Sequence, residues 1–206
     1  MRPLTTDDVM PLAEFAGRRR ELFQSLSRYL DRYRRVRIGP QATLVFENRQ
    51  TLWFRVQELL RIARLADPVR VQEELDLYNR LLPGRERLQA ALVIGGINET
   101  ETIEHLALWQ SLRGEDLCLR VGPRNLTADL ITCRPEDQVG GTAHWIQFTI
   151  AGDDRRQFTN FRVPARFAIS LKSYSHESPP LSEEVRQSLL DDLNLSDRDA
   201  FTEVSQ

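Results

Sequence analysis

The sequence predicts an α+β fold, in which N-terminal helices pack on a mostly antiparallel sheet and a further helix follows near the C-terminus. Two observations support this prediction. Apolar residues recur at helical spacing through the first third of the 206-residue chain, whereas short apolar runs separated by glycine turns dominate the remainder. Short connections between strands favour antiparallel pairing. No linker-like stretch interrupts the chain, so we expect a single domain over residues 1–195 and a polar, acidic tail over residues 196–206.

The first third is expected to contain three helices and one strand. Thr5 or Thr6 can cap the first helix, and Pro11 is tolerated only near its start. Asp67 followed by Pro68 is a typical start for the third helix. We expect helices ending near residue 35, near residue 66 and before residue 83, with a strand over residues 43–46 between the first two.

The remaining two thirds are expected to be rich in strands. Apolar and β-branched runs bounded by glycine predict strands over residues 88–94, 117–121, 126–132, 143–150 and 167–171. Asn98, with Glu101 three residues later, resembles a capping box at the start of a helix that ends at Gly114. A last helix follows Pro180 and ends near Leu193.

Composition excludes several classes of protein. The formal net charge is -2, which argues against a general nucleic-acid binder. No apolar run is long enough for a transmembrane helix, and the first residues lack the apolar core of a signal peptide. The two cysteines form no CxxC motif, so we expect free thiols in a reducing cytoplasm. We therefore predict a cytoplasmic protein without a membrane span.

Charge is distributed unevenly along the chain. Residues 18–37 carry eight arginines against two acids, whereas residues 181–206 carry seven acids against two arginines. The basic N-terminal helix and the acidic C-terminal helix can pair within one chain or between two chains. Solvated faces are the alternative. Only one of the 28 basic residues, Lys172, is a lysine.

A polar cluster in the segment 47–79 is the strongest candidate site. Its members lie where a strand passes into a helix, or at helical spacing on the next two helices. The cluster consists of Glu47, Asn48, Arg49, Gln57, Glu58, Arg61, Glu74, Tyr78 and Asn79. Three interpretations remain open: a salt network between helices, a ligand or partner site, and a metal or catalytic site. Neither helix contains a histidine, which argues against a di-iron centre of the Glu-x-x-His type.

Two histidines are candidate metal ligands. His144 lies in a predicted strand and His176 at a strand exit, so the pair, with a carboxylate, could bind a metal. A histidine that only satisfies local hydrogen bonds is the alternative for each. The sequence has no GxSxG, HExxH, GxGxxG or phosphate-loop motif, and therefore identifies no catalytic residue or cofactor.

Several motifs together resemble a bacterial domain family of unknown function. They are Phe46-Glu47-Asn48-Arg49, Val56-Gln57-Glu58 with Arg61-Ile62, Glu74-Leu75-Asp76, Tyr78-Asn79 and Leu81-Leu82-Pro83-Gly84, with weaker matches at Arg2-Pro3-Leu4-Thr5, Asp7-Asp8, Ala143-His144-Trp145, Tyr174 and His176. Members of that family are expected beside genes for rubrerythrin-like and iron–sulfur oxidoreductase proteins. The resemblance thus implies an accessory role in peroxide or iron handling. The sequence departs from the family pattern after Arg61-Ile62, where an acid is expected, and this weakens a metal interpretation.

Two functional hypotheses follow. The first is a cytoplasmic accessory or binding protein that acts with a protein partner, a redox or iron protein according to the resemblance. The alternative is a metal-dependent or small-anion-binding enzyme that uses the 47–79 cluster, with His144 or His176 arriving from the sheet. A third, structural hypothesis is a homodimer formed through the arginine-rich helix.

Overall fold

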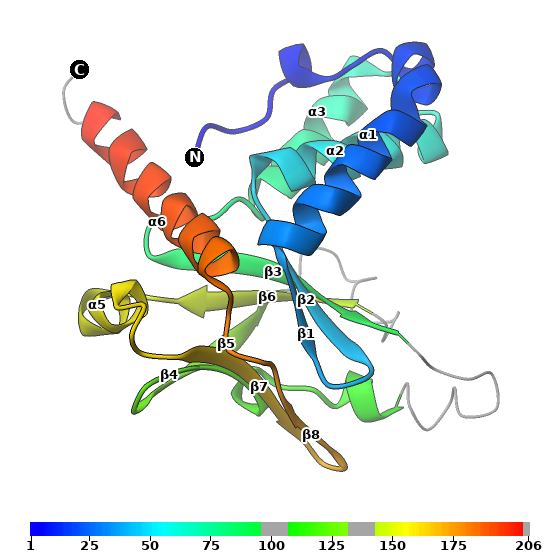
Figure 1. Ribbon diagram of the computed structural model, residues 1–206. Helices are drawn as coiled ribbons and strands as arrows, with labels where there is room; N and C mark the ends of the chain where they lie inside the picture. The colour runs from blue at the N-terminus through cyan, green and yellow to red at the C-terminus, as the bar shows by residue number, and fades with distance from the viewer. Residues whose placement is uncertain (96–106, 132–142, 204–206) are drawn as a thin grey trace.

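The sheet is antiparallel, as the sequence predicted, and the described residues contribute eight strands to it, two more than predicted. The computed structural model of the protein describes residues 1–95, 107–131 and 143–203 (Figure 1). The strand order is β1-β2-β3-β6-β5-β4-β7-β8, and every neighbouring pair is antiparallel. The strands are β1 (Arg35–Ile38), β2 (Ala42–Phe46), β3 (Arg87–Ile94), β4 (Leu117–Val121), β5 (Arg124–Ile131), β6 (Ala143–Thr149), β7 (Ala165–Leu171) and β8 (Tyr174–Glu177). The sheet curves until β1 returns to β7, so that it is nearly closed.

The helices lie in two groups (Figure 1). One group is α1 (Leu12–Tyr33), α2 (Arg49–Ala63) and α3 (Pro68–Asn79), preceded by the 3-10 turn η1 (Thr6–Asp8). The other is α5 (Gly152–Thr159) and α6 (Glu183–Glu203), and a second 3-10 turn, η3 (Gly114–Asp116), precedes β4. The helix α6 contacts both α1 and β3, and therefore joins the two groups.

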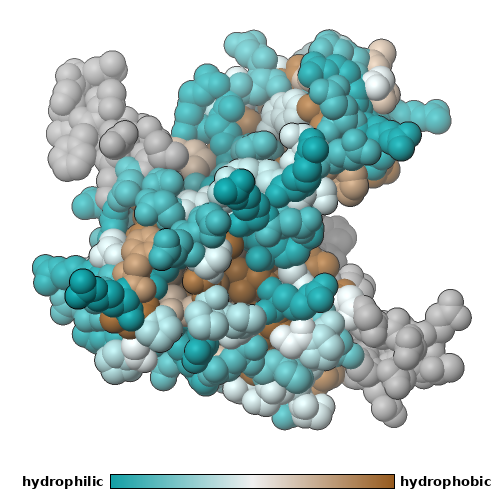
Figure 2. Space-filling model, viewed as in Figure 1, coloured by the Kyte–Doolittle hydropathy of each residue, from teal (hydrophilic) through white to brown (hydrophobic). Residues whose placement is uncertain are grey.

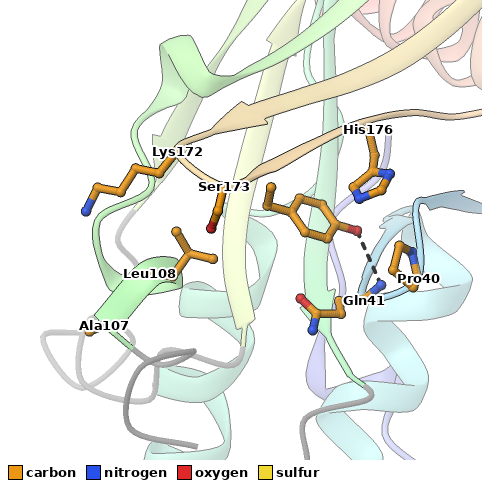
Figure 3. Close-up of a pocket in the computed structure, with 8 residues that line it drawn as sticks. Pro40, Gln41, Ala107, Leu108, Lys172, Ser173 and His176 are labelled. Carbon is orange, nitrogen blue, oxygen red and sulfur yellow. Dashed lines mark hydrogen bonds between the residues drawn. The ribbon is translucent and has the colours of Figure 1, made fainter. Parts of the chain in front are cut away.

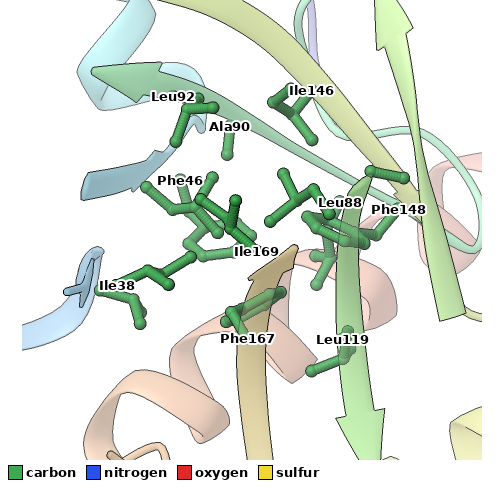
Figure 4. Close-up of a cluster of buried hydrophobic side chains, with 14 of the residues drawn as sticks. Ile38, Phe46, Leu88, Ala90, Leu92, Leu119, Ile146, Phe148, Phe167 and Ile169 are labelled. Carbon is green, nitrogen blue, oxygen red and sulfur yellow. The ribbon is translucent and has the colours of Figure 1, made fainter. Parts of the chain in front are cut away.

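The main hydrophobic core fills the inside of the curved sheet. Alternate residues along each strand point inward, because successive side chains of a strand face opposite sides. The inward set includes Phe46, Leu92, Ile146, Phe148 and Phe167, all fully buried (Figure 4). The helix α6 closes this core with the apolar residues Val185, Leu189, Leu190 and Leu193.

The predicted packing of the N-terminal helices on the sheet is wrong in part. These helices have hydrophobic clusters of their own, in which Leu52, Val56 and Leu60 of α2 meet Leu75 of α3. Among the described residues, Trp145 is the sheet residue that packs against these clusters, and the main core receives helical cover from α6. An amphipathic stripe predicts that a helix face is buried, but it does not specify the surface that buries it.

The start of the first helix also differs from the prediction. Thr5 caps only the 3-10 turn η1, with Asp8 closing the capping box, and α1 begins seven residues after Thr5, at Leu12. Pro11 is the N-cap of α1. A proline disfavours helical geometry in the residue before it, which explains why one continuous helix does not form.

Three further elements were not predicted. The strand β1 follows the first helix directly, where the sequence predicts only a turn at Gly39-Pro40. The helix α5 follows the turn signal Gly152-Asp153, and the strand β8 contains His176, which was expected at a strand exit. The predicted strand cores, and the second and third helices, are confirmed. The predicted helix at 98–114 lies mostly outside the described residues, although residues 107–110 are helical. The helix α6 extends to Glu203, beyond its predicted end. In the described part of the chain, no helix has the length and apolar character needed to cross a membrane.

Candidate functional site

Glu47 and Asn48 lie together at the junction of β2 and α2. Asn48 is the N-cap of α2, where its Oδ1 accepts hydrogen bonds from the backbone N–H groups of Gln50 and Thr51, each 3.0 Å long. Such a bond satisfies helix donors that have no partner within the helix. Glu47 is 1% exposed and accepts hydrogen bonds from the Thr51 hydroxyl and, at 2.8 Å, from Nε of Arg55. The carboxylate is thus buried and paired.

A chain of hydrogen bonds continues from this junction through the protein. Nδ2 of Asn48 donates to the Tyr29 hydroxyl at 2.8 Å, and Nε of Arg34 donates to the same hydroxyl at 2.9 Å. The Arg34 guanidinium also binds the Asp192 carboxylate of α6 through two nitrogens. Burial raises the pKa of Asp192, and Arg34 opposes that shift. We name this set the polar chain; it runs through Arg55, Glu47, Thr51, Asn48, Tyr29, Arg34 and Asp192.

Glu58 and Arg61 form a separate group with Arg19 of α1. Nε of Arg19 lies 2.6 Å from one Glu58 oxygen, and NH2 of Arg61 lies 3.0 Å from the other. Burial alone would raise the pKa of Glu58, but the hydrogen bonds from the two arginines lower it overall. This carboxylate is therefore held in its ionised form by two guanidinium groups.

Gln57, Asn79 and Arg49 fasten the N-terminal segment to the helices. Asn79 accepts from the backbone N–H of Leu4 at 2.8 Å and donates to its carbonyl at 2.9 Å. The fully buried Gln57 pairs in the same way with the backbone of Met10, at 2.6 and 3.3 Å. NH2 of Arg49 lies 2.6 Å from the Asp8 carboxylate and, chiefly through this contact, lowers the Asp8 pKa to about 2. These three predicted site residues thus hold an irregular segment in place.

The structure therefore divides the predicted cluster instead of bringing it into one pocket. Glu47 and Asn48 belong to the polar chain, Glu58 and Arg61 to the group around Arg19, and the fastening residues contact the N-terminal segment. The last two predicted members lie on α3, where Glu74 is half-buried and Tyr78 lines a groove described next.

A groove of about 420 Å³ lies between α1, α2 and the end of α3. Its lining is mostly apolar and consists of Phe23, Leu26, Leu30, Val45, Phe54, Leu59 and Ile62, with Thr51, Arg55, Glu58 and Tyr78. Two of the apolar side chains are largely exposed, Phe23 at 51% and Ile62 at 69%. Sequence reasoning missed this groove, although Ile62 lies outside the apolar stripe of its helix and was a signal of it.

The two candidate metal-ligating histidines have different surroundings. His144 is half-buried in β6, and burial lowers its pKa despite a hydrogen bond to the backbone of Trp109. Its Nε2 is buried without a hydrogen-bond partner. His176 is exposed in β8, where its ring lies 4.4 Å from that of Tyr174. Over residues 1–95, 107–131 and 144–194, whose side chains are described, no group of three His, Cys, Asp or Glu could hold a metal ion.

A second cavity, of about 630 Å³, lies where the β1–β2 and β7–β8 hairpins meet. Its lining includes His176, Lys172 and Ser173 from one hairpin and Gln41 from the other (Figure 3). Tyr174 also lines it. We name it the hairpin cavity.

Comparisons with known proteins place the chain in a family. A family model described as "Protein of unknown function (DUF3501)" matches residues 3–193. The chain belongs to the DUF3501 family. This bears out the expected membership of a family of unknown function, while the expected gene neighbours are not part of that finding. No curated protein matches the chain.

A solved crystal structure is similar to this chain over nearly its whole length. It is described as a novel protein of unknown function from Burkholderia pseudomallei K96243. The two chains are 26% identical, and the match covers 93% of this chain and 100% of the other with a TM-score of 0.82. The similarity supports the whole architecture but brings no activity with it.

Proposed function

We propose that this DUF3501 protein is a binding protein that holds an amphipathic helix of a partner protein in the groove between α1 and α2. The observation that carries this proposal is the exposure of Phe23 and Ile62 at a groove whose other walls are already apolar. Exposed apolar side chains that gather at one concave surface mark interaction sites, whereas scattered ones do not.

The dimensions of the groove suit a helix. Thr51, Arg55, Glu58 and Ile62 succeed one another along α2 and all line it. The first and the last are eleven positions apart, which corresponds to about 16 Å at the rise of an α-helix. A partner helix of about three turns therefore matches its length and can place apolar residues at positions i, i+3, i+4 and i+7 on Leu26, Phe54 and Leu59.

The charges around the groove favour acidic flanks on that helix. Glu58 is paired with both Arg19 and Arg61, so this part of the rim carries one more guanidinium than carboxylate. Arg20 of α1 and Arg64, which directly follows α2, are exposed and carry further positive charge on these elements. Hydrophilic side chains cover most of α1 on the face shown in Figure 2. Charge complementarity would therefore steer an acidic partner to this surface.

The class of the partner is a narrower proposal. A redox or iron protein is supported by the gene neighbours that the family resemblance implies, and by no contact in the structure. The enzyme alternative has less support, because the buried Glu47 and the half-buried Glu58 are both neutralised by arginines of the protein itself. Carboxylates in such pairs are poorly suited to bind a further cation or to accept a proton.

The test uses labelled helical peptides and the full-length protein. A peptide of about 18 residues, with an apolar i, i+3, i+4, i+7 stripe and glutamate flanks, is compared with one that has lysine flanks and with a scrambled one. We expect the glutamate peptide to bind most tightly in fluorescence anisotropy. Phe23→Asp and Ile62→Asp should each weaken its binding at least about tenfold.

Val69→Asp is the matched control, because Val69 is also apolar and is 68% exposed, but it lies on α3 and does not line the groove. This variant should bind like the unmodified protein. The proposal fails if none of the peptides binds, or if the three aspartate variants weaken binding equally. Circular dichroism establishes that each variant is folded.

A further inference from the structure

The hairpin cavity has a rigid wall built from both hairpins. The Tyr174 hydroxyl donates to the carbonyl of Ile38 and accepts from the backbone N–H groups of Gln41 and Ala42, at 3.2 and 3.1 Å. These bonds use the full hydrogen-bonding capacity of the hydroxyl. Tyr174, which lines the cavity, thus holds the β1–β2 turn in place, and its hydroxyl has no capacity left for a further hydrogen bond.

The turn itself is pressed against this wall. Gly39 has a φ of +68°, and a Cβ atom there would lie 2.5 Å from Cγ of His176 and 2.7 Å from the Tyr174 hydroxyl. No side chain fits at this position, so glycine allows the backbone of one hairpin to touch the side chains of the other. The cavity is therefore preformed, a feature of small-molecule sites.

Two nitrogen-bearing side chains stand at opposite ends of the cavity. Figure 3 shows Lys172 at one end and His176 at the other, with Ser173 and Leu108 between them. Lys172 is the only lysine of the chain and is exposed at the β7–β8 turn. Neither side chain forms a salt bridge among the described residues, and none of the lining residues named for the cavity is acidic.

We propose that the hairpin cavity binds a small dicarboxylate with a short apolar spacer. One carboxylate would pair with the Lys172 ammonium and the Ser173 hydroxyl, and the other would accept a hydrogen bond from the His176 imidazole. The spacer would lie on Leu108 and Tyr174, which both line the cavity. The volume of about 630 Å³ lies within the range of small-molecule sites. This site is independent of the α1–α2 groove, since the two share no residue.

The experiment compares three ligands that differ only in charge: adipate, its monomethyl ester and its dimethyl ester. Isothermal titration calorimetry measures affinity, and the amide signals of Gln41 and Ser173 in NMR spectra locate the ligand. We expect adipate to bind most tightly and the diester not to bind. Lys172→Asn and His176→Gln should each weaken adipate binding about tenfold or more. Asparagine suits the positive φ of 46° at position 172.

Two controls separate the site from general charge effects. Lys172→Arg keeps the positive charge and should bind adipate nearly as the unmodified protein does. The Arg156 side chain on α5 is 83% exposed. Arg156→Gln removes this cation and should leave the affinity for adipate unchanged. Equal affinities for adipate and its monomethyl ester would show that the site does not bind both carboxylates. Unchanged affinity in both cavity variants, or no binding at about 10 mM adipate, would overturn the proposal altogether.

Discussion

The curved sheet and the N-terminal helices are stabilised in different ways. The sheet encloses a large core that includes Phe46, Phe148 and Phe167 and is closed by an apolar face of α6. The helical region has smaller clusters, and its polar residues Gln57 and Asn79 bind the backbone of the irregular segment that precedes α1. Polar side chains that look like a functional site in the sequence can therefore serve to order a segment that has no regular structure of its own.

The polar chain is the link between these two regions. Arg34 ends α1, and its partner Asp192 lies on the helix that closes the sheet core. Both side chains are almost completely buried, at 4% and 3% exposure. The comparison between the two regions can therefore be tested by removing the Arg34–Asp192 pair, and then by destabilising the N-terminal helical region alone.

The largest effect is expected from Asp192→Ala. This change leaves the buried Arg34 guanidinium without its carboxylate, and breaking a buried ion pair costs about 3–5 kcal/mol of unfolding free energy. Hydrogen exchange should increase in α1 and in α6, because both regions lose the link. Urea denaturation measures the unfolding free energy, and mass spectrometry measures the hydrogen exchange.

The double variant Arg34→Met/Asp192→Leu is the matched control for that experiment. It removes both charges and fills a similar volume, so it should be more stable than Asp192→Ala alone. If the double variant is the less stable of the two, the pair does not act as the link described here.

A smaller and more local effect is expected from Asn79→Ala. The change removes two hydrogen bonds and leaves the backbone of Leu4 unsatisfied, at a cost of about 1–3 kcal/mol. Limited proteolysis should cleave the segment before α1 faster, while exchange in β3 and β6 stays unchanged. Gln72→Ala, on the same helix, removes only an exposed hydrogen bond to Asp76 and should have little effect. Faster exchange throughout the sheet would contradict a local role for Asn79.

The smallest effect is expected from Asp8→Asn, and it depends on pH. Arg49 lowers the folded-state pKa of Asp8 from 3.8 to about 2, so the carboxylate stabilises the fold at pH values above its unfolded pKa. This contribution is lost as the pH falls toward 2. The variant should lose about 1 kcal/mol at pH 7 after allowance for solvent screening, and the difference from the unmodified protein should shrink between about pH 4 and pH 2.

Urea denaturation at pH 7 and at low pH measures this difference. Asp7→Asn is the control, because Asp7 is the exposed neighbour of Asp8. Equal losses in the two variants would show that Arg49 does not distinguish between the two carboxylates.

Much of the secondary structure could be predicted because its signals are local. Asp67 does cap α3, with Pro68 in its first turn, and the β-branched run before Glu47 does form β2. The strand β1 was missed because arginines alternate with its apolar residues and resemble the arginine-rich helix before it. Which core each helix serves could not be predicted, since it depends on contacts between residues far apart in the sequence.

The candidate site was predictable only where its contacts are local. The capping role of the junction at Asn48 involves residues within three positions along the chain. Glu58, in contrast, pairs with Arg19, and Asn79 with Leu4, at separations of 39 and 75 residues. No spacing rule connects such positions. The sequence therefore identified residues that make specific contacts, but it did not identify their partners.

The Arg34–Asp192 pair has a consequence for synthesis of the chain. Its two members are 158 residues apart, and the Tyr174–Ile38 bond that joins the two hairpins spans 136. A ribosome makes the arginine 158 residues before the aspartate, so Arg34 must wait for its partner while the strands between them emerge. The N-terminal helices can form during translation, but enclosure of the sheet is a late event that follows release of α6. A truncated product that lacks this helix would expose the apolar interior, and would be a substrate for chaperones and proteases.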